Sequence, residues 1–245
     1  MPDRAEPADR PDRILSHFAC FTLGEAVWSL GGEARRELLD GLQRDAREAA
    51  PRVELYQLYP SRSDADLLLW SALPAEDPAA PARFFEGFAR AVSARRPALA
   101  PSHTLWGLTR SSPFTRRGGS SREIDAVDGA RDTYLIVYPF AKTARWYLRP
   151  EAERGEMMRD HIRVGRQFEG VRQLLLYSFG LQDQEFVVVY ETHDLSIFSE
   201  LVHALRSTEA RAFTALDTPI LTALHRGSGD REGEHPAAVW TPEGA

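Results

Sequence analysis

The sequence is poor in cysteine and contains no long apolar run. Cys20 is the only cysteine in 245 residues, which excludes an intrachain disulfide and cysteine-rich zinc or iron–sulfur sites. No stretch of about 18 apolar residues occurs, so no membrane-spanning helix is expected. Residues 1–13 are rich in Pro, Asp and Arg and have no apolar core, which argues against a signal peptide. We therefore expect a cytoplasmic protein without a membrane span.

Lysine is almost absent as well. Lys142 is the only lysine among 30 basic residues, and all the others are arginine. A general preference for arginine explains most of this bias, but it makes the one remaining lysine conspicuous. Lys142 is either a solvated surface charge or a site where a flexible point charge is needed in place of a planar guanidinium. The net charge is -6 with both signs interspersed and no basic stripe, so a nucleic-acid partner is not expected.

Hydrophobic periodicity predicts the same order of elements twice. An apolar content of 43% is typical of a globular protein, and each half of the chain has a βαββαβ pattern. The first unit has predicted strands at 14–23, 53–59, 66–73 and 103–109, with helices at 33–50 and 82–94. The second unit has predicted strands at 133–138, 172–179, 185–191 and 213–222, with helices at 150–168 and 195–205.

This order predicts an α+β fold in which two ferredoxin-like βαββαβ repeats pack as a dimeric α+β barrel within one chain. The N-terminal half covers 14–109 and the C-terminal half covers 133–226. Between them, 110–132 is rich in Ser, Gly and Arg and is predicted to be a linker. The segments 1–13 and 227–245 are predicted to be flexible ends.

A residue-level match supports the duplication. The segment that begins at Trp28 aligns with the segment that begins at Trp146, 118 positions later, and shares Trp, Leu, Glu, Ala and Arg in register. Residues common to both repeats are interpreted as structural, so both tryptophans are predicted to be packing residues. Function is expected where the repeats differ. In this register Tyr138, Lys142 and His161 correspond to Cys20, Gly24 and Gln43.

His161 lies on the apolar side of its predicted helix, together with Met157, Met158 and Val164. A lone histidine in such a place is more often a hydrogen-bonded core residue than a ligand. The functional alternative is an axial ligand to a haem iron whose opposite face stays open. No second His, Asp or Glu stands at the spacing of a zinc site, which makes zinc a poor candidate.

Other residues are ambiguous by themselves. Tyr138 ends an apolar strand and is either a half-buried packing residue or a redox-active phenol near an oxidised iron. Lys142 follows four residues later and could pair with a carboxylate, whereas Gln173 alone is uninformative. The remaining histidines, such as His193 and His203, are interpreted as surface or turn residues. The sequence contains no Ser-His-Asp arrangement, HExxH motif or Gly-rich phosphate loop.

Taken together, three motifs in the second half are specific. Tyr138-Pro-Phe-Ala-Lys142 is followed by Met157-Met-Arg-Asp-His161 and then by Ser178-Phe-Gly-Leu181. In these motifs the chain resembles the chlorite-dismutase-like superfamily, and within it most closely the coproheme decarboxylases of bacterial haem synthesis. The resemblance covers most of 133–222 and extends weakly over the first half.

The resemblance implies a role for each of these residues. His161 would be the proximal ligand of the haem iron, Tyr138 the catalytic tyrosine, and Lys142 a catalytic residue that holds a propionate. The porphyrin-binding residues would be Arg122, Tyr138, Pro139, Phe140, Ala141, Lys142 and Gln173. Anchoring on Ser178 places Gln173 at the distal position, whereas counting from His161 places Leu174 there. Arg172 is adjacent, and an arginine is what chlorite dismutases have at that position.

The resemblance also implies a reaction. Hydrogen peroxide would drive the oxidative decarboxylation of two propionates of iron coproporphyrin III (coproheme) to vinyl groups, which gives haem b. A homopentamer and a transient contact with the ferrochelatase that supplies the substrate would follow. The alternatives are a chlorite dismutase or peroxidase-like haem enzyme, a non-catalytic haem-binding or sensing protein, and a duplicated barrel without haem.

Overall fold

The computed structural model describes residues 13–110 and 122–226. The predicted flexible ends, apart from Arg13, and much of the predicted linker lie outside the described residues. The N-terminal half consists of β1 (Ile14–Leu23), α1 (Glu25–Trp28), α2 (Gly32–Arg47), β2 (Arg52–Gln57), β3 (Leu67–Pro74), α3 (Ala80–Ser93) and β4 (Leu99–Leu108). The C-terminal half consists of β5 (Tyr134–Lys142), α4 (Ala144–Tyr147), α5 (Glu151–Gly165), β6 (Val171–Tyr177), β7 (Phe186–Thr192), α6 (Leu195–Arg206), the 3-10 helix η1 (Glu209–Phe213), β8 (Thr214–Leu216) and β9 (Leu221–Arg226).

The end of the second repeat differs from the prediction. The predicted strand 213–222 is wrong, because this region contains the end of η1, the short β8 and the start of β9. The strand structure is interrupted between β8 and β9 near Pro219, which has no backbone N–H to donate to a sheet. The four-residue helices α1 and α4 were not predicted either, since one helical turn is too short to show hydrophobic periodicity.

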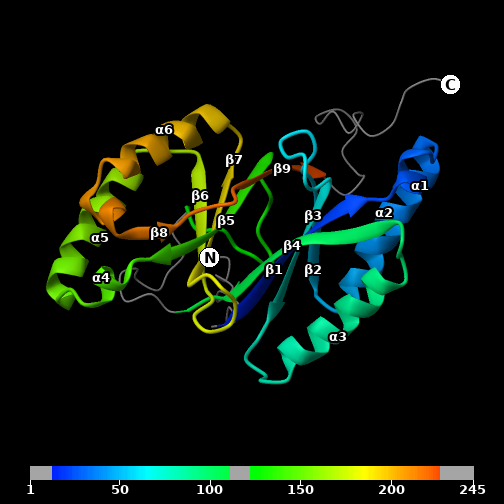
Figure 1. Cartoon of the computed structure of the whole chain (residues 1–245), viewed down its shortest axis with the longest axis horizontal. Coiled ribbons are helices and arrows are strands. Elements are labelled where there is room, and N and C mark those ends of the chain that lie inside the picture. The colour runs from blue at the N-terminus through cyan, green and yellow to red at the C-terminus, as the bar shows by residue number, and fades with distance from the viewer. Residues whose placement is uncertain (1–12, 111–121, 227–245) are drawn as a thin grey trace, which may run out of the picture.

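The two repeats close into one ring of strands. The strand order is β4-β1-β3-β2 in the first half and β6-β7-β5-β9 in the second, so the two halves have the same ferredoxin-like order. The halves are joined where Tyr56 pairs with His225 and where Leu108 pairs with Tyr177. Figure 1 shows the strands between two outer groups of helices, α1–α3 on one side and α4–α6 on the other. The predicted fold class is confirmed.

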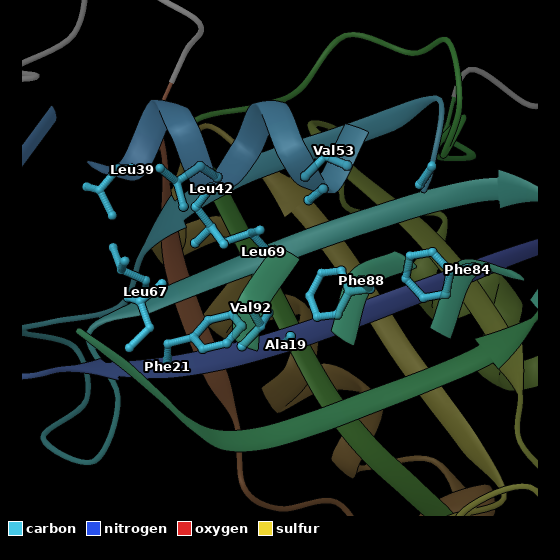
Figure 2. Packing of buried hydrophobic residues seen from close by; sticks show 14 of the residues in the cluster. Ala19, Phe21, Leu39, Leu42, Val53, Leu67, Leu69, Phe84, Phe88 and Val92 are labelled. Carbon is cyan, nitrogen blue, oxygen red and sulfur yellow. The ribbon is translucent and has the colours of Figure 1, made fainter. Parts of the chain in front are cut away.

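Each strand therefore separates an interior face from a helix-covered face. The interior cluster draws side chains from both halves, including Phe18, Trp70, Val137, Leu176 and Val189, all of which are almost fully buried. On the helix side, the first half packs α2 and α3 against its sheet through a dense apolar cluster (Figure 2). A smaller cluster, with Ile136, Val188 and Tyr190 among its members, lies under α6 in the second half.

One histidine contradicts the prediction that the remaining histidines are surface or turn residues. His17 is only 4% exposed, and its ring lies edge-on to the rings of Phe84, Phe85 and Phe88. Burial lowers the pKa of His17 to about 4, so the ring is neutral in this apolar surrounding.

Within the described ranges 13–110 and 122–226, no helix combines the length and the apolar character that crossing a membrane requires.

Leu176 and Leu175 provide a matched test of the interior face. Leu176 is fully buried inside the ring, whereas Leu175 points to the opposite face and is 36% exposed. We expect Leu176→Ala to lower the free energy of unfolding by about 2–5 kcal/mol, because it leaves a cavity in a close-packed core. Leu175→Ala should cost less than about 1 kcal/mol. Chemical denaturation measures both values, and equal losses would contradict this assignment of faces.

Candidate functional site

The structure corrects the register in which the two repeats were aligned. Glu25 and Ala144 begin equivalent short helices, and Gly32 and Glu151 begin the equivalent long ones, so equivalent residues are 119 positions apart. Trp28 therefore matches Tyr147, and both are 39% exposed, while Val27 matches Trp146 and both are buried. The prediction that Trp28 is a packing residue equivalent to Trp146 is wrong. Aligning the two tryptophans shifted the predicted register of the repeats by one residue.

The corrected register changes the residues that correspond to the candidate site. Tyr138, Lys142 and His161 now match Ala19, Leu23 and Leu42, in place of Cys20, Gly24 and Gln43. All three of these residues belong to the apolar cluster under α2 and α3. Figure 2 shows Ala19 and Leu42 within that cluster. Three core positions of the first half are thus occupied by three chemically capable side chains in the second.

The space beside α5 is also packed differently. In the first half, α2 buries six residues: Arg35, Leu39, Gly41, Leu42, Gln43 and Ala46. The equivalent α5 buries only Gly155 and Met157. Similarly, α3 buries five residues, including Phe84 and Phe88, whereas α6 buries only Leu201. α5 and α6 therefore bury fewer residues than α2 and α3 do, and a large planar ligand on this face would cover what they leave exposed.

His161 lies on α5 and is partly buried. Its Nδ1 is 3.2 Å from the hydroxyl oxygen of Thr208, and no described residue hydrogen-bonds its Nε2. Burial lowers the pKa of His161 below its ordinary value, and the nearby charge of Lys142 lowers it further. The imidazole is therefore neutral at pH 7, which is the form that binds a metal.

Tyr138 lies on β5 on the helix-covered face. Its ring is stacked with that of Tyr190 at a centroid distance of 6.3 Å. Burial raises the pKa of Tyr138 well above its ordinary value, and the interaction with Tyr190 raises it further. Tyr138 is thus a protonated phenol at neutral pH, with a second phenol beside it.

Lys142 lies at the end of β5, partly buried among aromatic rings. Its Nζ donates to the carbonyl oxygen of Ala210 at 3.0 Å and lies 4.4 Å from the ring centroid of Trp146. Glu185 accepts a hydrogen bond from the backbone N–H of Lys142 at 2.7 Å. Among the residues that the structure describes, no carboxylate forms an ion pair with Nζ. Burial and the charge of Arg211 lower the pKa of Lys142 to about 8, so the ammonium is held where an added carboxylate would stabilise it.

Strand alternation separates the three candidates for the distal position. Gln173 pairs with Tyr190 across β6 and β7 and is exposed on the helix-covered face. Leu174 is 6% exposed and belongs to the interior cluster. Arg172 also points away from α5, with its guanidinium 2.8 Å from a carboxylate oxygen of Glu191 and bonded to Asp132. Of these three side chains, only that of Gln173 lies on the same face as Tyr138.

Arg122 is adjacent to Gln173. Its carbonyl oxygen accepts the backbone N–H of Gln173 at 2.8 Å, and its guanidinium donates to the carbonyl oxygen of Arg166 at 2.6 Å. Arg166 follows directly after α5, so Arg122 connects the edge of β6 to the end of that helix.

Pro139 and its neighbours alternate between the two faces of β5. Pro139 pairs with Val187 of the interior cluster, so its side chain lies on the face opposite Tyr138, and its role in porphyrin binding stays a prediction. Phe140 lies on the Tyr138 side, with its ring centroid 5.3 Å from the Nζ of Lys142. Ala141 pairs with Leu216 of β8, and its role stays a prediction.

Thr208, Tyr190 and Glu185 were not predicted as site residues. Thr208 is 47 positions from His161, and no sequence spacing connects the two. Within the described part of the chain, no group of three or more His, Cys, Asp or Glu residues could hold a metal ion. A surface groove of about 650 Å³ over α4 and η1 has Leu148 and Phe213 in its lining, and none of the predicted site residues.

The sequence profile of the chlorite dismutase family matches residues 32–226. The chain belongs to the chlorite dismutase family. This confirms the resemblance inferred from the three motifs.

Individual relatives agree with this membership. The chain is 28% identical to a coproheme decarboxylase of Mycolicibacterium smegmatis over 78% of its own length and 82% of that protein. A solved structure named as a putative chlorite dismutase superposes with a TM-score of 0.73 at 27% identity, covering 87% of this chain and 95% of the other. A double mutant of the chlorite dismutase from Candidatus Nitrospira defluvii superposes with a TM-score of 0.72, covering 87% of this chain and 92% of the other; at 22% identity it supports the fold alone.

Because Lys142 is the only lysine, its titration can be followed without interference from other lysines. We expect the Cε signal of ¹³C-labelled lysine to titrate with a pKa of about 8 in the folded protein, well below the ordinary value of 10.5. Between these two values the unfolded chain binds more protons at this site than the folded chain does. The free energy of unfolding should therefore rise with pH over that interval. A folded-state midpoint near the ordinary value would contradict the burial of this ammonium.

Lys142→Met provides the control for the stability measurement. It removes the titrating group, so the rise that Lys142 causes between the two pKa values should disappear. Arg163→Met removes a charge on α5 that is paired with Asp160 and 65% exposed, and it should leave the rise unchanged.

Proposed function

We propose that this protein catalyses the hydrogen-peroxide-dependent oxidative decarboxylation of iron coproporphyrin III to haem b. The observation that carries the proposal is the replacement of Ala19, Leu23 and Leu42 by Tyr138, Lys142 and His161 at equivalent positions of the two repeats. Membership of the chlorite dismutase family and similarity to a coproheme decarboxylase over most of both chains support it. The proposal includes a homopentamer and a transient contact with the ferrochelatase that supplies the substrate.

The residues present fit an iron porphyrin. His161 is neutral and has an Nε2 that no described residue engages, which suits a single axial ligand. The sparsely packed face beside α5 and α6 would accept the macrocycle, with Gln173 on the sheet side and Arg122 at the edge. The Lys142 ammonium, which lacks a carboxylate partner among the described residues, would receive a propionate.

The chemistry divides between substrate and protein. The bound iron supplies the oxidising power that peroxide delivers. Tyr138 gives up an electron and its phenolic proton, and the resulting phenoxyl radical takes a hydrogen atom from the β-carbon of a propionate. Lys142 holds that carboxylate in place, and orientation of this kind is worth orders of magnitude in rate. Loss of carbon dioxide and of a second electron leaves the vinyl group.

The reaction balances with one peroxide for each propionate. One propionate carboxylate, one hydrogen peroxide and one proton give one vinyl group, one carbon dioxide and two waters. Two turnovers give haem b, and the porphyrin has to reorient between them because only one Tyr138–Lys142 pair is present.

Chlorite degradation is the alternative within the same family. That reaction is favoured by an arginine at the distal position, where this chain would present Gln173. The neighbouring Arg172 is held on the opposite face by Glu191 and Asp132. Peroxidase-like activity or non-catalytic haem binding would need His161 but neither Tyr138 nor Lys142.

The decisive experiment is reconstitution with iron coproporphyrin III without oxygen, followed by titration with hydrogen peroxide and mass analysis of the porphyrin. We expect the wild type to give two successive products, each with one propionate converted to a vinyl group. Tyr138→Phe should bind the porphyrin and leave it intact, since it has no phenolic hydrogen to lose. Lys142→Met should slow the reaction on the order of 100-fold through misplacement of the carboxylate.

Matched controls separate binding from reaction. His161→Ala should lose the axial ligand and, with it, the absorption spectrum of a histidine-ligated iron porphyrin. Arg163→Met should behave like the wild type. If the wild type binds the porphyrin but leaves it intact, the decarboxylase proposal fails, whereas the proposal that His161 binds the iron still stands. If the wild type binds no iron porphyrin, haem binding fails as well.

A further inference from the structure

Thr208 is a buried threonine whose side chain faces the candidate iron ligand. It is 7% exposed and directly precedes η1. Threonine at the N-cap of a helix usually accepts a hydrogen bond from a backbone N–H of the first turn. Thr208 makes no such bond. Its hydroxyl contacts two other groups, the carbonyl oxygen of Leu205 at 2.7 Å and Nδ1 of His161 at 3.2 Å.

The position of Thr208 is set by its surroundings on both sides. Its backbone N–H donates to the carbonyl oxygen of Leu205, and its own carbonyl oxygen accepts the N–H of Arg211. The residues that follow are held against α5 by a small apolar cluster that contains Trp146, Met157, Ala210 and Phe213. The hydroxyl is thus supported from the end of α6 and from η1.

Proton counting determines the direction of the two contacts. A threonine hydroxyl has one hydrogen, whereas a carbonyl oxygen can only accept. If the hydroxyl hydrogen pointed to His161, two oxygen atoms would face each other at 2.7 Å with no hydrogen between them. The hydrogen therefore lies toward Leu205. The contact with His161 is then a hydrogen bond only if Nδ1 of His161 carries the proton.

We propose that Thr208 is a positioning residue that holds His161 in the Nδ1–H tautomer, with Nε2 free, and that supplies a neutral acceptor in place of a carboxylate. The first part concerns the chain itself, and the second rests on the proposed function. A ligating histidine is oriented, and its basicity is tuned, by the acceptor of its other N–H. A hydroxyl that already donates elsewhere withdraws less of the Nδ1 proton than a carboxylate does. The imidazole then donates less electron density to iron.

A carboxylate stands close by in the sequence and provides the rival explanation. Glu209 follows Thr208 directly but is exposed. A carboxylate partner for His161 would be stronger than a hydroxyl, because hydrogen bonds to ionised acceptors are shorter and stronger. Thr208→Val and Glu209→Gln therefore test the two neighbours separately.

The first measurement uses the protein without porphyrin. Nitrogen-15 NMR of labelled histidine at neutral pH reports which ring nitrogen carries the hydrogen. We expect Nδ1–H for His161 in the wild type, in Thr208→Ser and in Glu209→Gln. Thr208→Val, which has nearly the same shape but no acceptor, should shift the population toward Nε2–H. An Nε2–H tautomer in the wild type, or a shift in Glu209→Gln and not in Thr208→Val, would overturn the proposal.

The second measurement uses the iron porphyrin complex, with the reduction potential and the iron–histidine stretching frequency as readouts. Thr208→Val should raise the potential, lower the frequency and weaken porphyrin binding by about 10-fold or more. Thr208→Asp should move the potential and the frequency in the opposite directions. Thr208→Ser, which keeps the hydroxyl, should retain the wild-type values. Unchanged potential and frequency in both Thr208→Val and Thr208→Asp would overturn the tuning role. A wild type that binds no porphyrin overturns the proposed function and with it the tuning role, while the tautomer measurement still decides the first part.

Discussion

The closure of two repeats into one ring of strands is the constraint on which the rest of the structure depends. Each half alone would leave a sheet with one apolar face uncovered. Pairing of β2 with β9 and of β4 with β6 brings these faces together around a shared interior. Because side chains alternate along a strand, filling the interior determines which residues are left on the helix-covered face. Tyr138 and Gln173 lie on that second face for this reason, and Leu174 and Pro139 do not.

Duplication allows one half to supply stability while the other carries the candidate site. In the first half, Ala19, Leu23 and Leu42 help to pack α2 and α3 against the sheet, and the interface is dense. In the second half the same positions hold Tyr138, Lys142 and His161, and α5 buries two residues where α2 buries six. Each of these polar groups would be costly in a dry core unless it were satisfied. A ligand that fills the space and accepts their interactions would remove that cost.

The candidate site could be predicted from the sequence to different extents at different residues. The motif around Tyr138, Lys142 and His161 pointed to three residues that the structure places on β5 and on α5, with Tyr138 on the helix-covered face. The internal alignment was wrong by one residue. It matched Trp28 with Trp146, whereas the structure matches Trp28 with Tyr147. In a strand, an error of one residue exchanges the two faces, so Cys20 was matched to Tyr138 although Cys20 belongs to the interior. Thr208 could not be predicted at all.

The sequence by itself determined the repeat, the fold class and the family, because hydrophobic periodicity and local motifs are properties of neighbouring residues. Only the tertiary structure decided which of Arg172, Gln173 and Leu174 lies on the helix-covered face. Counting residues along the chain leaves the distal position uncertain by one residue. The burial of Leu174 in the interior excludes Leu174 from the helix-covered face. It also decided that the partner of His161 is Thr208, 47 residues away on another element. Contacts of that kind arise when separate elements pack against each other, and no local pattern encodes them.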